Sequence, residues 1–130
     1  MIEFRDIHKS FGGTEILKGI NCTIPTGSVA VILGPSGSGK TTLLRSVNFL
    51  ERADRGEIIL DDLKIDVQTA SKSDIHAMRQ RTGMVFQSYN LFKNKTALEN
   101  VAEGLLVVKK LPKAKARERA LSYLDQVGLA

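Results

Sequence analysis

Residues 34–41 of this chain read GPSGSGKT, which fits the pattern G-x-x-x-x-G-K-[ST]. Glycines in such a loop allow a tight turn whose backbone N–H groups point inward around phosphate oxygens. A helix that begins near Lys40 directs the positive end of its dipole at the same anion. Lys40 then reaches the β- and γ-phosphates, while the Thr41 hydroxyl ligates Mg²⁺. The pattern predicts a nucleoside triphosphate site formed by Gly34, Pro35, Ser36, Gly37, Ser38, Gly39, Lys40, Thr41 and Thr42.

The segments on either side of this loop suit the same chemistry. Residues 29–33 form an apolar, β-prone run without alternation, which is typical of a central strand covered on both faces. The apolar side chains of residues 40–50 have helical spacing, at Leu43, Leu44, Val47 and Leu50. A buried strand before the loop and an amphipathic helix after it are the context that phosphate binding requires.

Turn signals predict antiparallel strands at the start of the chain. Gly12-Gly13 forms one turn, and residues 25–27 form another. Between these turns, period-two spacing is kept by Ile16, Ile20, Cys22 and Ile24. The first 33 residues are therefore expected to be strands joined by tight turns.

A second pair of strands is expected at residues 56–60 and 64–67, around a turn at Asp61-Asp62. Residues 84–86 are expected to form a short strand that leads into Gln87. The chain contains no internal repeat and no low-complexity segment.

Helix-start signals appear twice in the later part of the chain. Ser71 or Ser73 can cap a short helix that ends near Arg81. Thr96 and Glu99 form a capping box at the head of another helix.

The helix after Thr96 has one apolar face, formed by Leu98, Val101, Ala102, Leu105 and Val108. Pro112 breaks it, and a final helix is expected to run to Val127 and to stop at Gly128. The expected inner stripe of that final helix is Leu121, Leu124 and Val127.

Composition limits the class of protein. With 130 residues, 42% hydrophobic and 25% charged, the chain has the profile of one soluble globular domain. No apolar run approaches the roughly 20 residues of a membrane span, and the first residues do not read as a signal peptide. Cys22 is the single cysteine, so no internal disulfide is possible. A cytoplasmic domain is the default expectation.

The net charge of +5 has a local origin. Residues 109–119 hold six basic side chains and one acid, whereas the other 13 basic residues balance 13 acids. Such a stretch on a helix is typical of a solvated face, and an anionic partner such as a lipid headgroup or a polynucleotide is the alternative. No run of aromatic residues accompanies it, so nucleic acid is not an expected partner.

Two strings, GPSGSGKTT and VFQSYNLFKNKTALENV, together resemble the ATP-binding subunit of an ABC transporter. The second resembles the glutamine-loop region of the branch that imports polar amino acids, and IEFRDIHKSFGGTEILKGI and NFLERADRGEII fit that branch. The resemblance implies an α/β fold in which residues 1–95 form a P-loop NTPase core with an N-terminal antiparallel β part. Residues 96–130 would begin an α-helical subdomain, so the chain resembles the N-terminal half of a nucleotide-binding domain.

The same resemblance assigns roles to two more residues. Phe11 matches the aromatic residue that stacks on adenine, a task for which an apolar ring is suited, although a core position is the alternative for it. Gln87 matches the glutamine that contacts Mg²⁺ or the attacking water and relays to the membrane subunit. Lys40 and Gln87 are therefore the expected catalytic residues, and Thr41 and Gln87 are the expected contacts of Mg²⁺.

Parts of the family's machinery are missing. LSGGQ, the Walker B stretch with its Asp-Glu, and the switch histidine lie further along a longer domain, and no SGG occurs here. Residues 58–62 resemble a Walker B strand with Asp61 as a possible metal-linked carboxylate, but the alternating residues behind them favour a hairpin turn. His8 and His76, the two histidines, are expected at the surface. The chain is expected to bind MgATP and hardly to hydrolyse it.

The resemblance also implies partners and a location. These are a transmembrane permease subunit, a second ATP-binding subunit and an extracytoplasmic amino-acid-binding protein, at the cytoplasmic face of the membrane. Without the Walker B strand an edge of the sheet would be open, so the fragment is expected to dimerise, with helix exchange across residues 109–113 as one route.

Two other functions remain as alternatives. A stand-alone P-loop kinase would use Asp61 and an arginine-bearing lid drawn from Arg79, Arg81, Arg117 and Arg119. A fragment that only self-associates would show no effect of nucleotide on melting. The transported amino acid is not readable from these residues.

Overall fold

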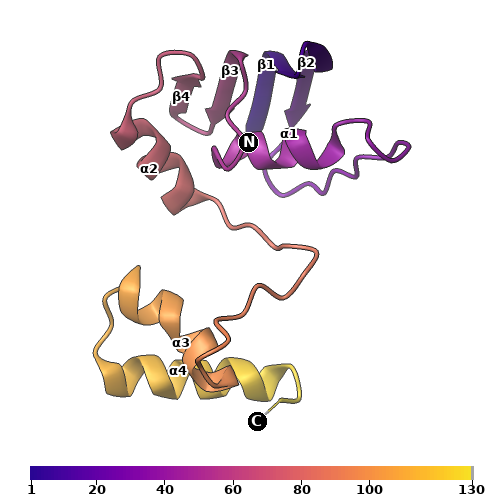
Figure 1. The fold of residues 1–130 in the computed structure, drawn as a ribbon. Helices are drawn as coiled ribbons and strands as arrows, with labels where there is room; N and C mark the ends of the chain where they lie inside the picture. The colour runs from indigo at the N-terminus through magenta and orange to yellow at the C-terminus, as the bar shows by residue number, and fades with distance from the viewer. Residues whose placement is uncertain (130) are drawn as a thin grey trace. The chain divides into compact units, whose positions relative to one another are not determined.

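The computed structural model describes residues 1–129 (Figure 1). The chain divides into two compact units, an N-terminal unit, Met1–Met84, and a C-terminal unit that begins at Val85. The domain boundary expected at residues 95/96 stays a prediction. Within the described residues, none of the helices combines the length and apolar character that a membrane crossing needs.

The N-terminal unit is built on a four-stranded antiparallel sheet with the order β2-β1-β3-β4. Its strands are β1 (Ile2–Phe11), β2 (Thr14–Ile24), β3 (Arg55–Leu60) and β4 (Leu63–Asp66). Gly12 and Gly13 form the turn between β1 and β2, and Asp61 and Asp62 form the turn between β3 and β4. Both predicted hairpins are therefore confirmed, and so is the turn at Pro25, whose carbonyl accepts the Ser28 N–H at 3.2 Å.

The core of this unit joins the sheet to two helices, α1 (Lys40–Val47) and α2 (Lys72–Arg81). Leu43 of α1 and Met78 of α2 pack with the strand residues Phe4, Ile7 and Ile58. Of the two predicted caps, Ser71 and Ser73, it is Ser71 that caps α2, in a capping box with Asp74. Of the apolar positions predicted for α1, Leu43 is buried and Val47 is partly buried against this core, whereas Leu44 and Leu50 are exposed.

Helix α1 is shorter than predicted. It ends at Val47 rather than at Leu50, because Phe49 turns into a left-handed conformation with φ of +56° and is buried. The Arg79 guanidinium donates to the carbonyl oxygens of Asn48 at 2.9 Å and of Phe49 at 3.0 Å. Carbonyls at a helix end lack an intrahelical partner, so α2 supplies one from a distant position.

The prediction of a strand at residues 29–33 is wrong. No strand is formed there; the side chain of Val29 is 92% exposed and that of Leu33 is 86% exposed. A strand needs a neighbour for its N–H and C=O groups, and this segment does not belong to the four-stranded sheet of the described residues. The short strand predicted at residues 84–86 is absent as well, with Val85 exposed.

Strand β2 departs from simple alternation. Ile7 pairs with Ile20 and His8 with Lys18, which leaves Gly19 as an extra residue with φ of +70°. Such a bulge reverses the phase of the buried face along a strand. Leu17 is therefore the buried residue on one side of it, and Cys22, predicted to face inward, is exposed.

A charged group that we call the His8 cluster links three strands through Asp6, His8, Glu15 and Arg55. The His8 ring lies 2.6 Å from a Glu15 oxygen and 2.9 Å from an Asp6 oxygen, and Arg55 lies 3.2 Å from Asp6. The hydrogen bond with Glu15, and after it that with Asp6, raises the pKa of His8 above its ordinary value, while Arg55 opposes the shift. His8 is half-buried, and His76 is exposed as expected.

The C-terminal unit is a pair of helices, α3 (Ala97–Val107) and α4 (Lys113–Gln126). Thr96 and Glu99 form the predicted capping box, and Gly128, with φ of +72°, follows the end of α4 as predicted. All six basic residues between 109 and 119 are exposed.

The buried stripe of α4 differs from the prediction. Its members are Ala116, Ala120 and Leu124, which are four residues apart and lie inward in this helix pair. The buried residue of α3 is Ala102. Small side chains at that spacing let two helices approach closely. Leu121 and Val127, predicted to lie inward, are exposed, and Val108 is exposed just beyond α3.

Candidate functional site

The predicted phosphate loop connects the extended residues 29–33 to α1. Lys40 is the first residue of that helix, and its ammonium group donates to the carbonyl oxygens of Gly34 at 2.9 Å and Pro35 at 2.7 Å. The Ser38 N–H donates to the Pro35 carbonyl at 3.3 Å, which closes the turn. The loop thus folds back around the cation of its own lysine.

Gly39 fixes the loop against the sheet. It is the N-cap of α1 with φ of +91°, a conformation that residues with a side chain rarely adopt. A Cβ atom there would lie 2.8 Å from the Ile16 side chain and 2.9 Å from that of Leu17. The absence of a side chain therefore lets β2 support the loop from behind.

A cavity of about 270 Å³ brings together two of the predicted features. It is lined by Phe11 and Ile16 from the sheet and by Gly37, Ser38, Gly39, Lys40, Thr41 and Thr42 from the loop and helix. None of these residues is acidic, and Lys40 is the cation among them. A site with a cation, hydroxyl groups and the start of a helix suits an anion, and the aromatic ring beside it suits a flat ligand.

Phe11 is the last residue of β1, and its side chain is 45% exposed. The alternative that it is a core residue is therefore wrong. Gly34 and Pro35 line a second hollow of about 250 Å³, together with Ile32 and Leu33. Ser36 is exposed at the turn of the loop and lines neither cavity.

The residues that would hold magnesium are few. Thr41 is exposed in the first turn of α1, and its hydroxyl is an oxygen ligand of the kind that Mg²⁺ prefers. Among residues 1–129, no group of three or more His, Cys, Asp or Glu side chains could hold a metal ion. Magnesium would therefore rely on Thr41, the predicted contact of Gln87, water and the phosphates of its ligand, which fits a metal that arrives with a nucleotide.

Asp61 lies in the tight turn between β3 and β4, where its carboxylate pairs with the amino group of Met1 at 2.5 Å. The hairpin interpretation of this segment is confirmed. Asp62 in the same turn pairs with Arg81.

Gln87 belongs to the C-terminal unit and is exposed. Its predicted contact with Mg²⁺ or water stays a prediction.

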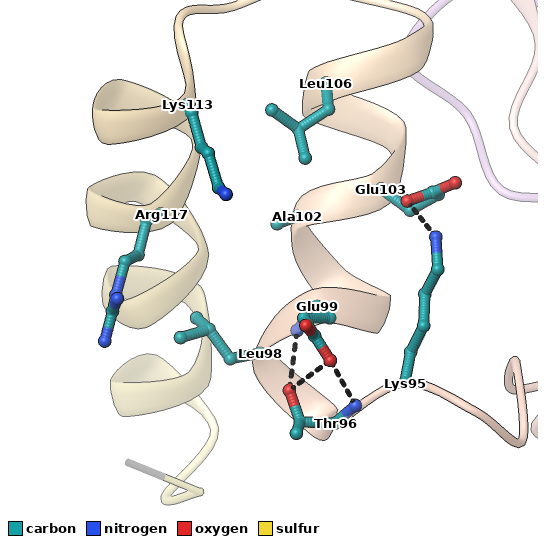
Figure 2. A pocket seen from close by; sticks show the side chains of 9 residues that line it. All are labelled: Lys95, Thr96, Leu98, Glu99, Ala102, Glu103, Leu106, Lys113 and Arg117. Carbon is teal, nitrogen blue, oxygen red and sulfur yellow. Dashed lines mark hydrogen bonds and ion pairs between the residues drawn. The ribbon is translucent and has the colours of Figure 1, made fainter.

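A cavity of about 560 Å³ in the C-terminal unit lies beside α3 and α4 (Figure 2). Leu98, Ala102 and Leu106 form its apolar part. The Glu99 carboxylate accepts from the Thr96 N–H at 2.7 Å, and the Glu103 carboxylate pairs with Lys95. Both acids are therefore engaged locally, while Lys113 and Arg117 complete the lining. Sequence reasoning missed this cavity, because a capping box indicates only where a helix begins.

The sequence profile of the ABC transporter family matches residues 17–130. The chain belongs to the ABC transporter family. This finding confirms the resemblance carried by the phosphate loop and the segment around Gln87.

Individual members of the ABC transporter family are also similar to the chain. It is 54% identical to a probable amino-acid ABC transporter ATP-binding protein of Haemophilus influenzae, over 99% of this chain and 51% of that protein. It is 50% identical to the L-cystine import ATP-binding protein TcyN of Bacillus subtilis, over 99% of this chain and 50% of that protein. The chain spans about half the length of these curated relatives.

Solved ABC transporter structures confirm the predicted fold class. A dimeric bacterial ABC transporter cassette has a TM-score of 0.81 and 33% identity, over 96% of this chain and 56% of that one. A dimeric post-hydrolysis state of an ATP-binding cassette, bound to ADP and Pi, has a TM-score of 0.79 and 32% identity. It covers 96% of this chain and 56% of that chain. The sheet and four helices are thus part of an ABC cassette, with its antiparallel β part at the N-terminus.

Proposed function

We propose that this chain supplies the ATP-binding part of a subunit that drives amino-acid import by an ABC transporter. The cavity shared by Phe11 and the phosphate loop is the observation that carries the proposal, because it joins a cationic anion site to an exposed aromatic ring. The 54% and 50% identity to ATP-binding proteins named for amino-acid and cystine transport supports the substrate class.

Each side chain of the site has a distinct task in this proposal. The ammonium group of Lys40 exchanges its two carbonyl partners, on Gly34 and Pro35, for oxygens of the β- and γ-phosphates. The Thr41 hydroxyl holds magnesium, which neutralises phosphate charge when bound. Phe11 stacks on the adenine.

Hydrolysis requires more than this chain contains. A residue must orient or deprotonate the attacking water, and a partner must stabilise the charge of the transferring phosphoryl group. The sequence has no LSGGQ and no glutamate after a Walker B strand. Gln87 contributes to the complete site by contacting the water or Mg²⁺. This chain alone therefore binds MgATP and hydrolyses it very slowly.

The complete protein works within an assembly. Its partners are a transmembrane permease subunit, a second copy of the ATP-binding subunit and an extracytoplasmic amino-acid-binding protein, and it lies at the cytoplasmic face of the membrane. The relatives named for import and the dimeric cassettes of similar fold support these partners. Residues 1–95 belong to the nucleotide-binding core of that subunit, and residues 96–130 begin its helical subdomain.

Calorimetric titration of the 130-residue chain tests the binding claim, with ATP and AMP each in the presence of Mg²⁺. ATP should bind and AMP should not, because AMP lacks the β- and γ-phosphates. Lys40→Ala should weaken ATP by about 10- to 150-fold, since a hydrogen bond to a charged group contributes about 1.5–3 kcal/mol. Lys18→Ala, which removes an exposed lysine that does not line the cavity, is the matched control.

Equal affinity for ATP and AMP, or an unchanged affinity in Lys40→Ala, would contradict the proposal. Phosphate release measured on the same samples checks the second claim. Turnover that matches a complete ABC ATPase would show that this chain holds the hydrolytic residues after all.

A further inference from the structure

The end of β1 extends beyond its neighbour β3. The pairing between these strands stops at His8, which lies opposite Arg55, so the last three residues of β1 have no strand on that side. Asp54 takes the place of the strand. Its N–H donates to the His8 carbonyl at 2.8 Å, and its carboxylate accepts the Ser10 N–H at 2.6 Å.

The same carboxylate holds a lysine. The Lys9 ammonium lies 3.0 Å from an Asp54 oxygen and 3.3 Å from a Glu51 oxygen, and the Lys9 side chain is only 13% exposed. The Ser10 N–H, together with Lys9, holds the pKa of Asp54 below its ordinary value, so this carboxylate remains charged at neutral pH. The Lys9 ammonium is therefore held in place by two carboxylates, those of Asp54 and Glu51.

Lys9 in turn contacts Phe11. Residues two apart on a strand lie on the same face, and the Lys9 ammonium is 5.1 Å from the centre of the Phe11 ring. A cation at that distance from an aromatic ring is attracted by the electrons of the ring. The exposed ring is thus held by a partly buried cation although it lies at the very end of a strand.

We propose that Lys9 and Asp54 are positioning residues that fix the Phe11 ring at the edge of the phosphate-loop cavity, ready to stack on the base of a nucleotide. Asp54 anchors the backbone at Ser10 and holds Lys9, and Lys9 limits the motion of the ring. This inference rests on the proposed ATP-binding function and adds two residues that do not touch the nucleotide themselves.

Preorganisation of this kind affects one part of a ligand. Holding an aromatic side chain in its bound orientation lowers the entropy lost when a base stacks on it. The phosphates, which contact the loop and Lys40, gain nothing from an ordered Phe11 ring. Loss of the anchor should therefore weaken ATP and leave inorganic tripolyphosphate unaffected.

Calorimetric titration with each of these two ligands, in Mg²⁺, measures that difference. Lys9→Met should weaken ATP by about two- to fivefold, which corresponds to the strength of an exposed cation–π contact, with tripolyphosphate unchanged. Lys9→Arg keeps the cation and should restore ATP affinity. Lys64→Met, on β4 and outside the cavity, is the matched control and should change neither ligand. Equal losses for both ligands in Lys9→Met would overturn the proposal.

A fluorescence measurement without ligand tests the anchor directly. The chain contains no tryptophan, so Phe11→Trp introduces a single reporter at the position in question. Adding Asp54→Ala or Lys9→Met to this variant should lower the anisotropy of the indole, because the ring becomes freer to move. Unchanged anisotropy in both double variants would refute the positioning role.

Failure of the two proposals is distinguishable. If the unmodified chain binds tripolyphosphate but Phe11→Ala does not lower its preference for ATP, the stacking role of Phe11 is wrong. If Phe11→Ala lowers that preference and Lys9→Met does not, then Phe11 stacks on the base but Lys9 does not position it.

Discussion

Substitution of Gly39 by alanine tests whether β2 supports the phosphate loop. Two costs add at this position. The φ of +91° imposes a strain of about 1–2 kcal/mol on a residue with a Cβ atom. The new methyl group would also lie 2.8 Å from the Ile16 side chain and 2.9 Å from Leu17, and overpacking of this kind costs about 1–3 kcal/mol. Gly39→Ala should therefore lower the free energy of unfolding by about 2–5 kcal/mol.

Gly37 provides the matched control within the same loop. Its φ is +78°, but a Cβ atom there would meet nothing within 4 Å. Gly37→Ala should cost only the strain of about 1–2 kcal/mol. The difference between the two variants isolates the contact of the loop with Ile16 and Leu17.

Urea denaturation of both variants, followed by circular dichroism, measures this difference, and equal slopes would show that the unfolding transition itself is unchanged. Titration with ATP on the same samples shows whether the crowded loop also loses its ligand. If Gly37→Ala lowers the free energy of unfolding as much as Gly39→Ala does, then β2 does not support the loop.

Three further perturbations follow from the packing and the charges. Met78→Ala should lower the free energy of unfolding by about 2–5 kcal/mol, because Met78 is fully buried, whereas the exposed Val85→Ala should change it by less than about 0.5 kcal/mol in the same urea titration. Thr96→Ala should destabilise α3 by about 1 kcal/mol and Thr96→Ser should not, as read from amide hydrogen exchange of α3. The raised pKa of His8 means that its contribution to stability is fully present below about pH 6.5 and is lost as the pH rises through the folded-state pKa. His8→Gln should therefore be more damaging at pH 6 than at pH 9, and equal losses would contradict the ion pairs of the His8 cluster.

Local signals predicted much of this fold. The turn at Gly12-Gly13, the helix cap at Ser71 or Ser73 and the capping box at Thr96 depend on residues no more than a few positions apart, and the structure has a turn, a cap and a capping box at these places. The motif at residues 34–41 is equally local, and its cavity with Phe11 follows once β1 and β2 form a hairpin.

The features that the sequence did not predict depend on contacts between residues far apart in the chain. Residues 29–33 have the composition of a strand, but strand formation depends on a partner that the sequence of the segment does not reveal. Helix α1 stops early where Phe49 is buried, and the carbonyls at its end are bound by Arg79, about thirty positions away. Asp54 and Lys9 are separated by 45 positions, and no local pattern marks the contact between them.

The exposed run at residues 29–33 also bears on how a cell handles this chain during synthesis. No charged residue occurs between Lys18 and Lys40, and the run itself is rich in β-branched side chains. Short segments of that composition nucleate intermolecular strands when they are exposed, and they are the surfaces on which unfinished chains aggregate. Pro25 and Pro35 flank the run, and a proline cannot donate a hydrogen bond to a growing sheet. The two prolines therefore act as gatekeeper residues that limit the length of chain able to join an intermolecular strand.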